Sequence, residues 1–260
     1  MKEFIVIDVG NTDLVIALIL NFKIYKVFRY KTKKFKENKN VKNLSNLLFA
    51  FLKKRINKRT KIHSIISSVV PEINNKITKI CISFLNEKPI FISSDKTQLN
   101  IRIKLKKKSE VGSDRISNAV AVKSLHKYPA IIIDFGTATT FDVIDKVGNY
   151  VGGLITPGIN LSLDALYTKT SKLPLIRLKK TKRIVGKDTV SAMQNGIYWG
   201  YIGLISFLIK KIKSQYKFKF NTIATGGYAK LFSLNIKEIN KVDENLTILG
   251  LIEIFKLNYE

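Results

Sequence analysis

Residues 4–13, FIVIDVGNTD, and residues 130–142, AIIIDFGTATTFD, share one pattern: an apolar strand runs into Asp-x-Gly and then into small polar residues. Aligning 5–10 with 131–136 leaves a second, similar strand after each glycine. A repeat spaced by about half of the chain indicates a duplicated domain, because solenoid repeats have periods of about 20–50 residues. We therefore predict two similar domains, residues 1–112 and 113–260, with a ligand cleft between their equivalent turns.

The remaining patterns predict an α/β fold, in which helices cover a sheet in each half. Apolar spacing separates the helices from the strands, and glycine or proline marks their ends. We expect strands at 3–9, 14–20, 23–30, 63–70 and 88–93, and helices at 41–52, 73–85 and 113–125. In the second half we expect two strands within 130–145, a third at 149–158, helices at 161–166 and 189–213, a strand–turn–helix unit at 221–232 and a closing helix at 244–257.

The charge is strongly positive: 46 Lys and Arg against 19 Asp and Glu give +27 over 260 residues. Such an excess suits nucleic acid, an acidic membrane surface or phosphorylated small molecules. The basic runs are rich in lysine and poor in interleaved aromatic residues, so a base-stacking surface is not indicated. We favour a solvated lysine surface, and the charge leaves nucleic acid open as a less favoured partner.

No apolar run is long enough to span a membrane, and Asp8 interrupts the N-terminal apolar stretch too early for a signal peptide. The single cysteine, Cys81, excludes an internal disulfide and suits a reducing cytoplasm. It lies on the apolar side of an expected helix, so we predict core packing for it. We expect a cytoplasmic protein with no membrane partner.

The two Asp-x-Gly turns carry groups suited to phosphate chemistry. A carboxylate that ends an apolar strand is costly to bury unless it is paired or binds a cation. Glycine lets backbone N–H groups approach a ligand closely. The following polar residues, Asn11, Thr12, Thr137, Thr139 and Thr140, offer short hydrogen-bonding groups. One such turn could simply close a hairpin, but two in equivalent halves favour phosphoryl transfer.

Other nucleotide and catalytic motifs are absent from the sequence. Gly186-Lys187 comes nearest to a Walker loop, but Thr181 stands where its first glycine belongs and Asp188 follows the lysine. No G-x-G-x-x-G follows a strand. The two histidines, His63 and His126, lie outside any motif, so a Ser-His-Asp triad or a zinc site is not indicated.

A third polar cluster lies in SEVGSDRISNAVAV, residues 109–122. Asp114 and Arg115 fall in the first turn of an expected helix, where a carboxylate is stabilised as the anion. One interpretation is a helix cap, by Ser113 or Asp114, beside a surface arginine. The other makes Asp114 a general base and Arg115 a ligand for a substrate carboxylate. This stretch alone does not separate the two.

Seven motifs follow one another along nearly the whole chain: DVGNT (8–12), SSVVP (67–71), VGSDR (111–115), DFGTATTFD (134–142), GGLITPG (152–158), GKDTVSAMQNGI (186–197) and ATGG (224–227). In this order they resemble the type III pantothenate kinases, the first enzymes of coenzyme A biosynthesis. The resemblance implies the duplicated, ribonuclease H-like fold of the actin-like ATPases, with paired phosphate turns. It also implies ATP-dependent phosphorylation of pantothenate to 4'-phosphopantothenate.

The resemblance also assigns roles to individual residues. ATP is implied at Asp8, Val9, Gly10, Asn11, Thr12, Asp13, Leu14, Val15 and Thr137, with Mg²⁺ nearest Asp8. Pantothenate is implied at Gly112, Ser113, Asp114, Arg115 and Thr189, with Asp114 as proton acceptor and Thr189 acting across a homodimer interface. Asp134 is implied as the ligand of a monovalent cation, K⁺ or NH₄⁺. Leu105 stands where many relatives have a substrate-contacting tyrosine, and Lys108 where a proline is usual.

Two other functions stay open at this point. One is a nucleic-acid-binding or regulatory protein on the same fold, which the charge supports. The other is a kinase of the same superfamily that acts on a different small acceptor, since fold alone does not define a substrate. The three carboxylates of Asp8, Asp114 and Asp134 favour an enzyme, because they would repel the phosphates of a nucleic acid.

Overall fold

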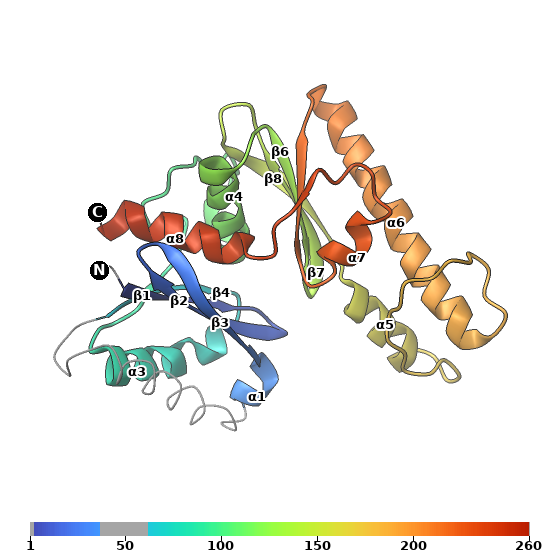
Figure 1. Ribbon diagram of the computed structural model, residues 1–260, viewed down its shortest axis with the longest axis horizontal. Helices are drawn as coiled ribbons and strands as arrows, with labels where there is room; N and C mark the ends of the chain where they lie inside the picture. Colours follow the sequence, from blue (N-terminus) through green and yellow to red (C-terminus); the bar gives the residue numbers. More distant parts are fainter. Residues whose placement is uncertain (1–2, 37–61, 260) are drawn as a thin grey trace. The chain divides into compact units, whose positions relative to one another are not determined.

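The computed structural model describes residues 3–36 and 62–259 (Figure 1). The helix predicted at 41–52 lies outside the described residues. The described chain forms two compact units, 3–36 and 62–124 with 246–259 (unit 1) and 125–245 (unit 2). Each unit contains one five-stranded sheet.

The sheet of unit 1 has the order β3-β2-β1-β4-β5. Strands β1 (Glu3–Val9), β2 (Asp13–Leu20) and β3 (Lys23–Lys31) form consecutive antiparallel hairpins, and α1 (Thr32–Lys36) follows them. Strands β4 (His63–Ser68) and β5 (Ile90–Phe91) add to the other side of β1 in parallel. The predicted strand at 88–93 is therefore much shorter than expected.

Helices cover both faces of β1, which explains its continuous apolar sequence. Ile5, Ile7 and Val9 belong to a core that includes residues of α3 (Asn74–Leu85), among them the buried Cys81. Phe4 stacks instead on Phe255 of α8 (Leu246–Tyr259), with ring centroids 3.8 Å apart. Burial raises the pKa of the Cys81 thiol to about 11, so the predicted packing role of Cys81 is confirmed.

The sheet of unit 2 repeats this order, as β8-β7-β6-β9-β10. Strands β6 (Ala130–Phe135), β7 (Ala138–Ile144) and β8 (Tyr150–Pro157) are antiparallel, and β9 (Asn221–Gly226) and β10 (Lys241–Val242) are parallel to β6. Helices α5 (Ile159–Thr168), α6 (Thr189–Tyr216) and α7 (Ala229–Ser233) supply the residues that pack on β6. The two equal strand orders confirm the predicted α/β duplication.

The division of the chain differs from the predicted boundary after residue 112. Helix α4 (Ser113–Leu125) packs within unit 1, against the C-terminal α8. Thr247 Oγ1 donates to Asn118 Oδ1 over 2.9 Å, and a Cβ added to Gly250 would lie 1.8 Å from the Ser117 carbonyl oxygen. This close crossing of two helices far apart in sequence draws residues 113–124 and 246–259 into unit 1.

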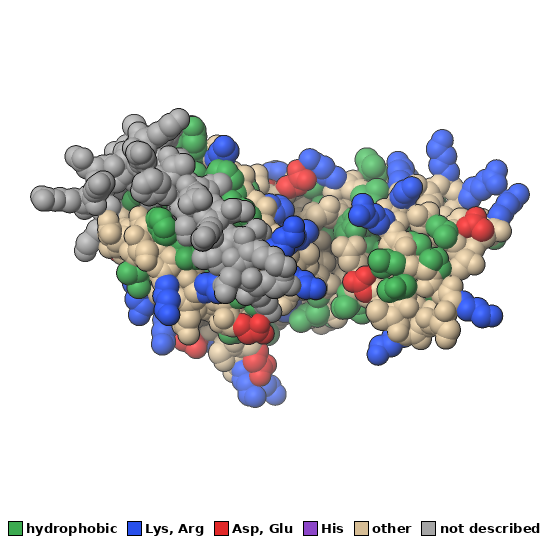
Figure 2. All heavy atoms as spheres, turned by 90° about the horizontal axis from the view of Figure 1, so that it is seen from below, with side chains coloured by type: hydrophobic (Ala, Val, Ile, Leu, Met, Phe, Trp, Pro, Cys, Tyr) green, Lys and Arg blue, Asp and Glu red, His purple; other side chains and the backbone are tan. Residues whose placement is uncertain are grey.

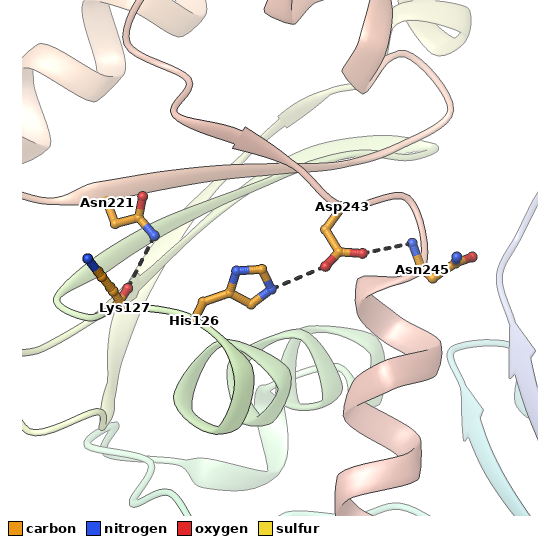
Figure 3. Close-up of polar contacts among 5 residues, drawn as sticks. All are labelled: His126, Lys127, Asn221, Asp243 and Asn245. Carbon is orange, nitrogen blue, oxygen red and sulfur yellow. Dashed lines mark hydrogen bonds and ion pairs between the residues drawn. The ribbon is translucent and has the colours of Figure 1, made fainter. Parts of the chain in front are cut away.

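A hydrogen-bonded pair of side chains joins the two segments of unit 2 that lead to α4 and α8. His126 Nε2 and Asp243 Oδ2 are 3.1 Å apart, and their side chains are 3% and 15% exposed (Figure 3). Asp243 Oδ1 also accepts the N–H of Asn245. On the same loop, the Lys127 carbonyl accepts a hydrogen bond from Asn221 Nδ2 over 3.3 Å. His126 follows the end of α4 and has a structural partner in Asp243.

Candidate active site

The first Asp-x-Gly turn connects β1 to β2 in unit 1. Asp8 lies beside Ser67 of β4 in the parallel register. The Gly10 N–H donates to the Asp13 carbonyl over 2.9 Å, which closes the turn. Thr32 holds the turn from the core side: its N–H donates to the Thr12 carbonyl over 3.0 Å and its Oγ1 to the Gly10 carbonyl over 2.7 Å. The tip of the turn is therefore fixed and exposed.

The side chains predicted to bind ATP in this stretch differ in exposure. Asn11 and Thr12 are exposed, whereas those of Val9, Leu14 and Val15 are buried in the core. Asp13 Oδ1 forms an ion pair with Lys31 Nζ over 2.8 Å. Within this stretch, the exposed polar side chains come from the tip of the turn.

The third polar cluster lies at the start of α4, in the same unit. Asp114 Oδ1 accepts the N–H of Arg115 over 2.8 Å. A Cβ added to Gly112 would lie 2.5 Å from Asp114 Oδ1, so the carboxylate occupies space that only glycine leaves open. Ser113 Oγ contacts Ser67 Oγ at 3.0 Å. Because Ser67 lies beside Asp8, the motifs DVGNT, SSVVP and VGSDR meet at the carboxyl ends of β1 and β4.

Burial dominates the electrostatics of Asp114. It raises the pKa of the Asp114 carboxyl group, and the N–H and the positive charge of Arg115 oppose it. A carboxyl group with a raised pKa is a stronger base than an ordinary aspartate once it is ionised. A raised pKa at a cleft or turn is also a common feature of acid–base groups in enzymes.

The second Asp-x-Gly turn connects β6 to β7 in unit 2. Asp134 lies beside Thr225 of β9, and Gly226 follows with φ +88°. A Cβ on Gly226 would lie 2.6 Å from Asp134 Oδ1. Thr137 at the tip of the turn is exposed. A side chain at position 226 of the ATGG motif would therefore crowd the Asp134 carboxylate.

The GGLITPG motif packs against this second turn. A Cβ on Gly158 would lie 2.0 Å from the Thr137 carbonyl oxygen, so Gly158 allows a close backbone approach. The Pro157 carbonyl accepts a hydrogen bond from the Tyr201 hydroxyl of α6 over 2.7 Å. The motifs DFGTATTFD, GGLITPG and ATGG thus meet in unit 2, as DVGNT, SSVVP and VGSDR meet in unit 1.

Thr189 is the first residue of α6 and is exposed. The helix is capped by Asp188, whose side chain accepts the Ser191 N–H over 2.8 Å, while Ser191 Oγ bonds back to Asp188. These bonds lower the pKa of the Asp188 carboxyl group. The cap therefore belongs to Asp188, which leaves the Thr189 side chain outside the capping bonds.

Several supporting residues had no predicted role. Thr32 and Tyr201 support the two turns, and no sequence pattern marked them. Ser67 belongs to the SSVVP motif, but its hydrogen bond with Ser113 forms only in the tertiary structure. The part of the chain that the structure describes contains no group of three or more His, Cys, Asp or Glu side chains suited to hold a metal ion.

The comparisons with known proteins match this arrangement. The sequence profile of the family described as type III pantothenate kinase matches residues 4–211. The type III pantothenate kinase of Paramagnetospirillum magneticum is 40% identical over 97% of this chain and 96% of its own. That of Sulfurihydrogenibium sp. is 41% identical over 94% of this chain and 96% of its own.

A solved structure supports the fold independently. The inorganic polyphosphate/ATP-glucomannokinase of Arthrobacter sp. aligns over 98% of both chains with a TM-score of 0.51, at 13% identity. The duplicated sheets agree with the actin-like ATPase fold, and the profile match covers most of the chain. The chain therefore belongs to the type III pantothenate kinase family.

Proposed function

We propose that this chain transfers the γ-phosphoryl group of ATP to the primary hydroxyl of pantothenate and forms 4'-phosphopantothenate, the first step of coenzyme A biosynthesis. Membership of the family carries the proposal. The position of Gly112-Ser113-Asp114-Arg115 supports the proposal. This stretch, which resembles the pantothenate-binding sequence of the family, lies next to the strand that carries Asp8 and the first phosphate turn. We place the reaction in the cytoplasm.

Unit 1 supplies the acceptor side of the reaction in this proposal. Arg115 holds the carboxylate of pantothenate, for which a guanidinium group offers paired donors. The rest of the pantothenate site is formed by Gly112, Ser113 and Asp114. Asp114 takes the proton of the attacking hydroxyl. Asp8 and the exposed turn at 10–12 face the phosphates, with the longer stretch Asp8–Val15 as the ATP segment.

Mg²⁺ enters the proposal with ATP. This ion is usually held by one or two carboxylates together with substrate phosphates and water. A single carboxylate, Asp8, at the end of β1 fits that pattern. When bound, the ion would neutralise charge on the phosphates.

Unit 2 supplies the second phosphate turn and the monovalent cation ligand. Thr137, exposed at the tip, contacts ATP, and Asp134 binds K⁺ or NH₄⁺. Gly226 and Gly136 let the backbone pass close to this carboxylate, because an added Cβ would lie 2.6 and 3.6 Å from Asp134 Oδ1. A carboxylate oxygen is a ligand that a small cation accepts, and a bound cation would stabilise its charge.

We further propose that the enzyme is a homodimer, in which Thr189 of one copy contacts pantothenate bound to the other. Helix α6 supports this because it carries exposed Gly196, Gly200 and Gly203, where an added Cβ would meet nothing within 4 Å. Phe207, 57% exposed, continues the same helical stripe. Small residues and an exposed aromatic on one stripe suit close contact with another helix.

The nucleic-acid alternative has weaker support. Figure 2 shows Lys and Arg side chains scattered over the described part of one face, with acidic and apolar side chains between them. A nucleic-acid surface usually gathers its basic residues in a patch or stripe.

No described helix is both long and apolar enough to cross a bilayer.

A coupled ADP-release assay, with and without pantothenate and with Na⁺ in place of K⁺, tests the proposal. We expect ADP release to depend on pantothenate and on K⁺. Asp114→Asn should lower kcat by about 10² or more while ATP still binds. Asp95→Asn, an exposed carboxylate of unit 1, is the matched control and should keep wild-type turnover. ADP release that ignores pantothenate would argue against this substrate.

A further inference from the structure

The hydroxyl group of Ser113 is buried at the start of α4, and its hydrogen-bonding capacity is used within unit 1. Its Oγ donates to the Ser68 carbonyl oxygen over 3.2 Å and accepts the Ser68 N–H over 2.9 Å. Ser67 Oγ lies 3.0 Å away, and either of the two hydroxyls can donate this bond. A serine hydroxyl has one donor and two acceptor sites, so three partners are as many as it can bond.

This set of bonds is not a helix cap. A capping side chain accepts an N–H from its own helix, two or three residues further on. The partners of Ser113 Oγ belong instead to β4. The first turn of α4 is closed by the Ile116 N–H, which donates to the Gly112 carbonyl over 3.1 Å. The hydroxyl therefore fastens the start of the helix to the end of a strand.

The Asp114 side chain lies directly beside this attachment. Asp114 follows Ser113 directly, and its Oδ1 accepts the N–H of Arg115 over 2.8 Å, above the space that Gly112 leaves open. The carboxylate is thus folded over the 112–115 backbone, whose position Ser113 fixes. Ser67 lies beside Asp8, so the same bonds relate the proposed base to the strand that carries the first turn.

We propose that Ser113 and Ser67 are positioning residues for Asp114. Their hydroxyl pair holds the first turn of α4 against β4 so that the Asp114 carboxylate keeps the direction and burial that its role as base requires. The side chain of Ser113 is then not a ligand of pantothenate, although its backbone remains part of the substrate stretch. This inference rests on the proposed kinase function, and its test separates the two.

The experiment compares Ser113→Ala, Ser113→Thr, Ser67→Ala and the double Ser67→Ala/Ser113→Ala variant with the full wild-type chain. Steady-state kinetics give kcat and the KM values for ATP and pantothenate, and kcat/KM is followed against pH. Ser68→Ala is the matched control, because its hydroxyl donates to Asn74 Oδ1 over 2.6 Å, whereas Ser113 uses only the backbone of Ser68.

We expect Ser113→Ala to lower kcat by about 10-fold or more, since small misplacements of a reacting group cost up to about 10² in rate. Its KM for ATP should stay unchanged, and the acidic limb of its kcat/KM profile should move. Ser67→Ala should act in the same direction, and the double variant should be no worse than Ser113→Ala, because the two hydroxyls act as a pair. Ser113→Thr should restore part of the rate, and Ser68→Ala should behave as wild type.

A wild-type kcat and acidic limb in Ser113→Ala would overturn the inference. A rise in the KM for pantothenate at constant kcat would also overturn it, because the hydroxyl would then be a substrate ligand. If Ser113→Ala does not fold, Ser67→Ala and Ser113→Thr decide by the same criteria. If the wild-type chain shows no pantothenate-dependent ADP release, the proposed function fails. An NMR titration of the Asp114 carboxyl carbon then tests the positioning role by itself. Identical titration curves in wild type and a folded variant contradict that role, and a moved midpoint supports it.

Discussion

Asp114 is subject to opposing influences on its protonation. Burial raises the pKa of its carboxyl group, and the N–H and charge of Arg115 act in the other direction without cancelling that rise. A general base must be ionised to accept a proton, so the rate falls as the pH drops through this raised pKa. The ordinary pKa of an aspartate is about 3.9. We predict that the acidic limb of the kcat/KM profile has its midpoint above this value.

Initial rates from pH 4 to 8 at saturating ATP measure this limb. Asp114→Asn should remove it together with most of the rate, whereas Asp95→Asn should leave it in place. A limb that persists unchanged in Asp114→Asn would assign the titration to another group.

Gly226 is the residue that lets Asp134 occupy its position. Its φ of +88° disfavours any L side chain, and a Cβ would lie 2.6 Å from Asp134 Oδ1 and 2.7 Å from the Phe135 backbone. We predict that Gly226→Ala destabilises the protein by about 1 to 3 kcal/mol, from backbone strain, and displaces the Asp134 carboxylate. The K⁺ concentration that gives half-maximal activity should rise.

Gly227→Ala is the matched control, because a Cβ there meets nothing within 4 Å. It should keep both the wild-type denaturation midpoint and the K⁺ dependence. Equal K⁺ dependence in Gly226→Ala and wild type would remove Asp134 from the proposed cation site.

At the scale of elements, the crossing of α4 and α8 defines unit 1. The added Cβ at Gly250 would lie 1.8 Å from the Ser117 carbonyl oxygen, which is backbone and cannot turn aside. Gly250→Ala must therefore separate the two helices. Overpacking of this kind typically costs about 1 to 3 kcal/mol, and we expect at least the upper end in chemical denaturation.

Gly196→Ala in α6 gives the comparison for Gly250→Ala. Both are glycines within helices, but a Cβ at 196 meets open space. We expect the fold of one copy to be more stable by about 0.5 to 1 kcal/mol in this variant, from helix propensity alone. Equal losses in the two variants would contradict the close crossing.

The His126–Asp243 pair makes stability depend on pH. Hydrogen bonding from His126 is the largest cause that lowers the pKa of the Asp243 carboxyl group. The unfolded chain then binds more protons in the acid range, so stability is fully present above the ordinary pKa of aspartate and is lost as the pH falls through the lower, folded value. Asn245 N–H and the Lys241 charge add to the same effect.

We predict that Asp243→Asn costs about 1.5 to 3 kcal/mol at pH 6, the range for a hydrogen bond to a charged group. The difference from wild type should shrink as the pH falls below 4. Urea denaturation at several pH values measures both effects, with Asp164→Asn, an exposed position on α5, as the control. A constant difference across this range would show that the carboxylate charge is not responsible.

The elements that the sequence predicted well are those with a local signal. Strand β1 is a continuous apolar run, and the predicted range 3–9 equals its observed bounds. The predicted helix at 189–213 begins at the observed residue of α6 and ends three residues early, at Lys213 instead of Tyr216. Strands β5 and β10 have two residues each, too few for a periodic pattern, and they exist because a longer parallel neighbour supplies hydrogen bonds.

At the scale of the whole molecule, the duplication was predictable because each copy keeps an Asp-x-Gly turn after its first strand. Both sheets place that strand third in the same order, with hairpins on one side and parallel strands on the other. The limits of the units were not predictable, because α8 joins unit 1 from the far end of the chain. Nothing local in the sequence indicates that Gly250 meets Ser117.

The candidate site was predictable to the level of motifs. The carboxylates and glycines stand in the sequence, and their roles follow from the chemistry of phosphate and from the family. The contacts that orient them could not be predicted, because Thr32, Ser67 and Tyr201 act through tertiary hydrogen bonds. A hydroxyl has no sequence pattern that tells a buried anchor from a surface residue.

The exposed glycine stripe of α6 yields a prediction about assembly. Gly196, Gly200 and Gly203 have no described neighbour within reach of an added Cβ, so a larger side chain at Gly200 should not harm the fold of one copy. Leucine is a better helix former than glycine by roughly 0.8 kcal/mol, so Gly200→Leu should preserve or raise stability. If this stripe contacts a second copy, the same substitution should prevent close approach of the helices.

We therefore predict that wild type sediments as a dimer and that Gly200→Leu sediments as a folded monomer. Thr189 at the start of α6 is proposed to contact the pantothenate bound to the other copy. Loss of the dimer in Gly200→Leu should therefore lower kcat/KM for pantothenate by at least about 10-fold, because a positioned substrate contact is lost. Ser83→Leu on the exposed side of α3 is the control and should remain dimeric and active. A dimeric, fully active Gly200→Leu variant would exclude this stripe from the interface, and a fully active monomer would show that Thr189 has no role across it.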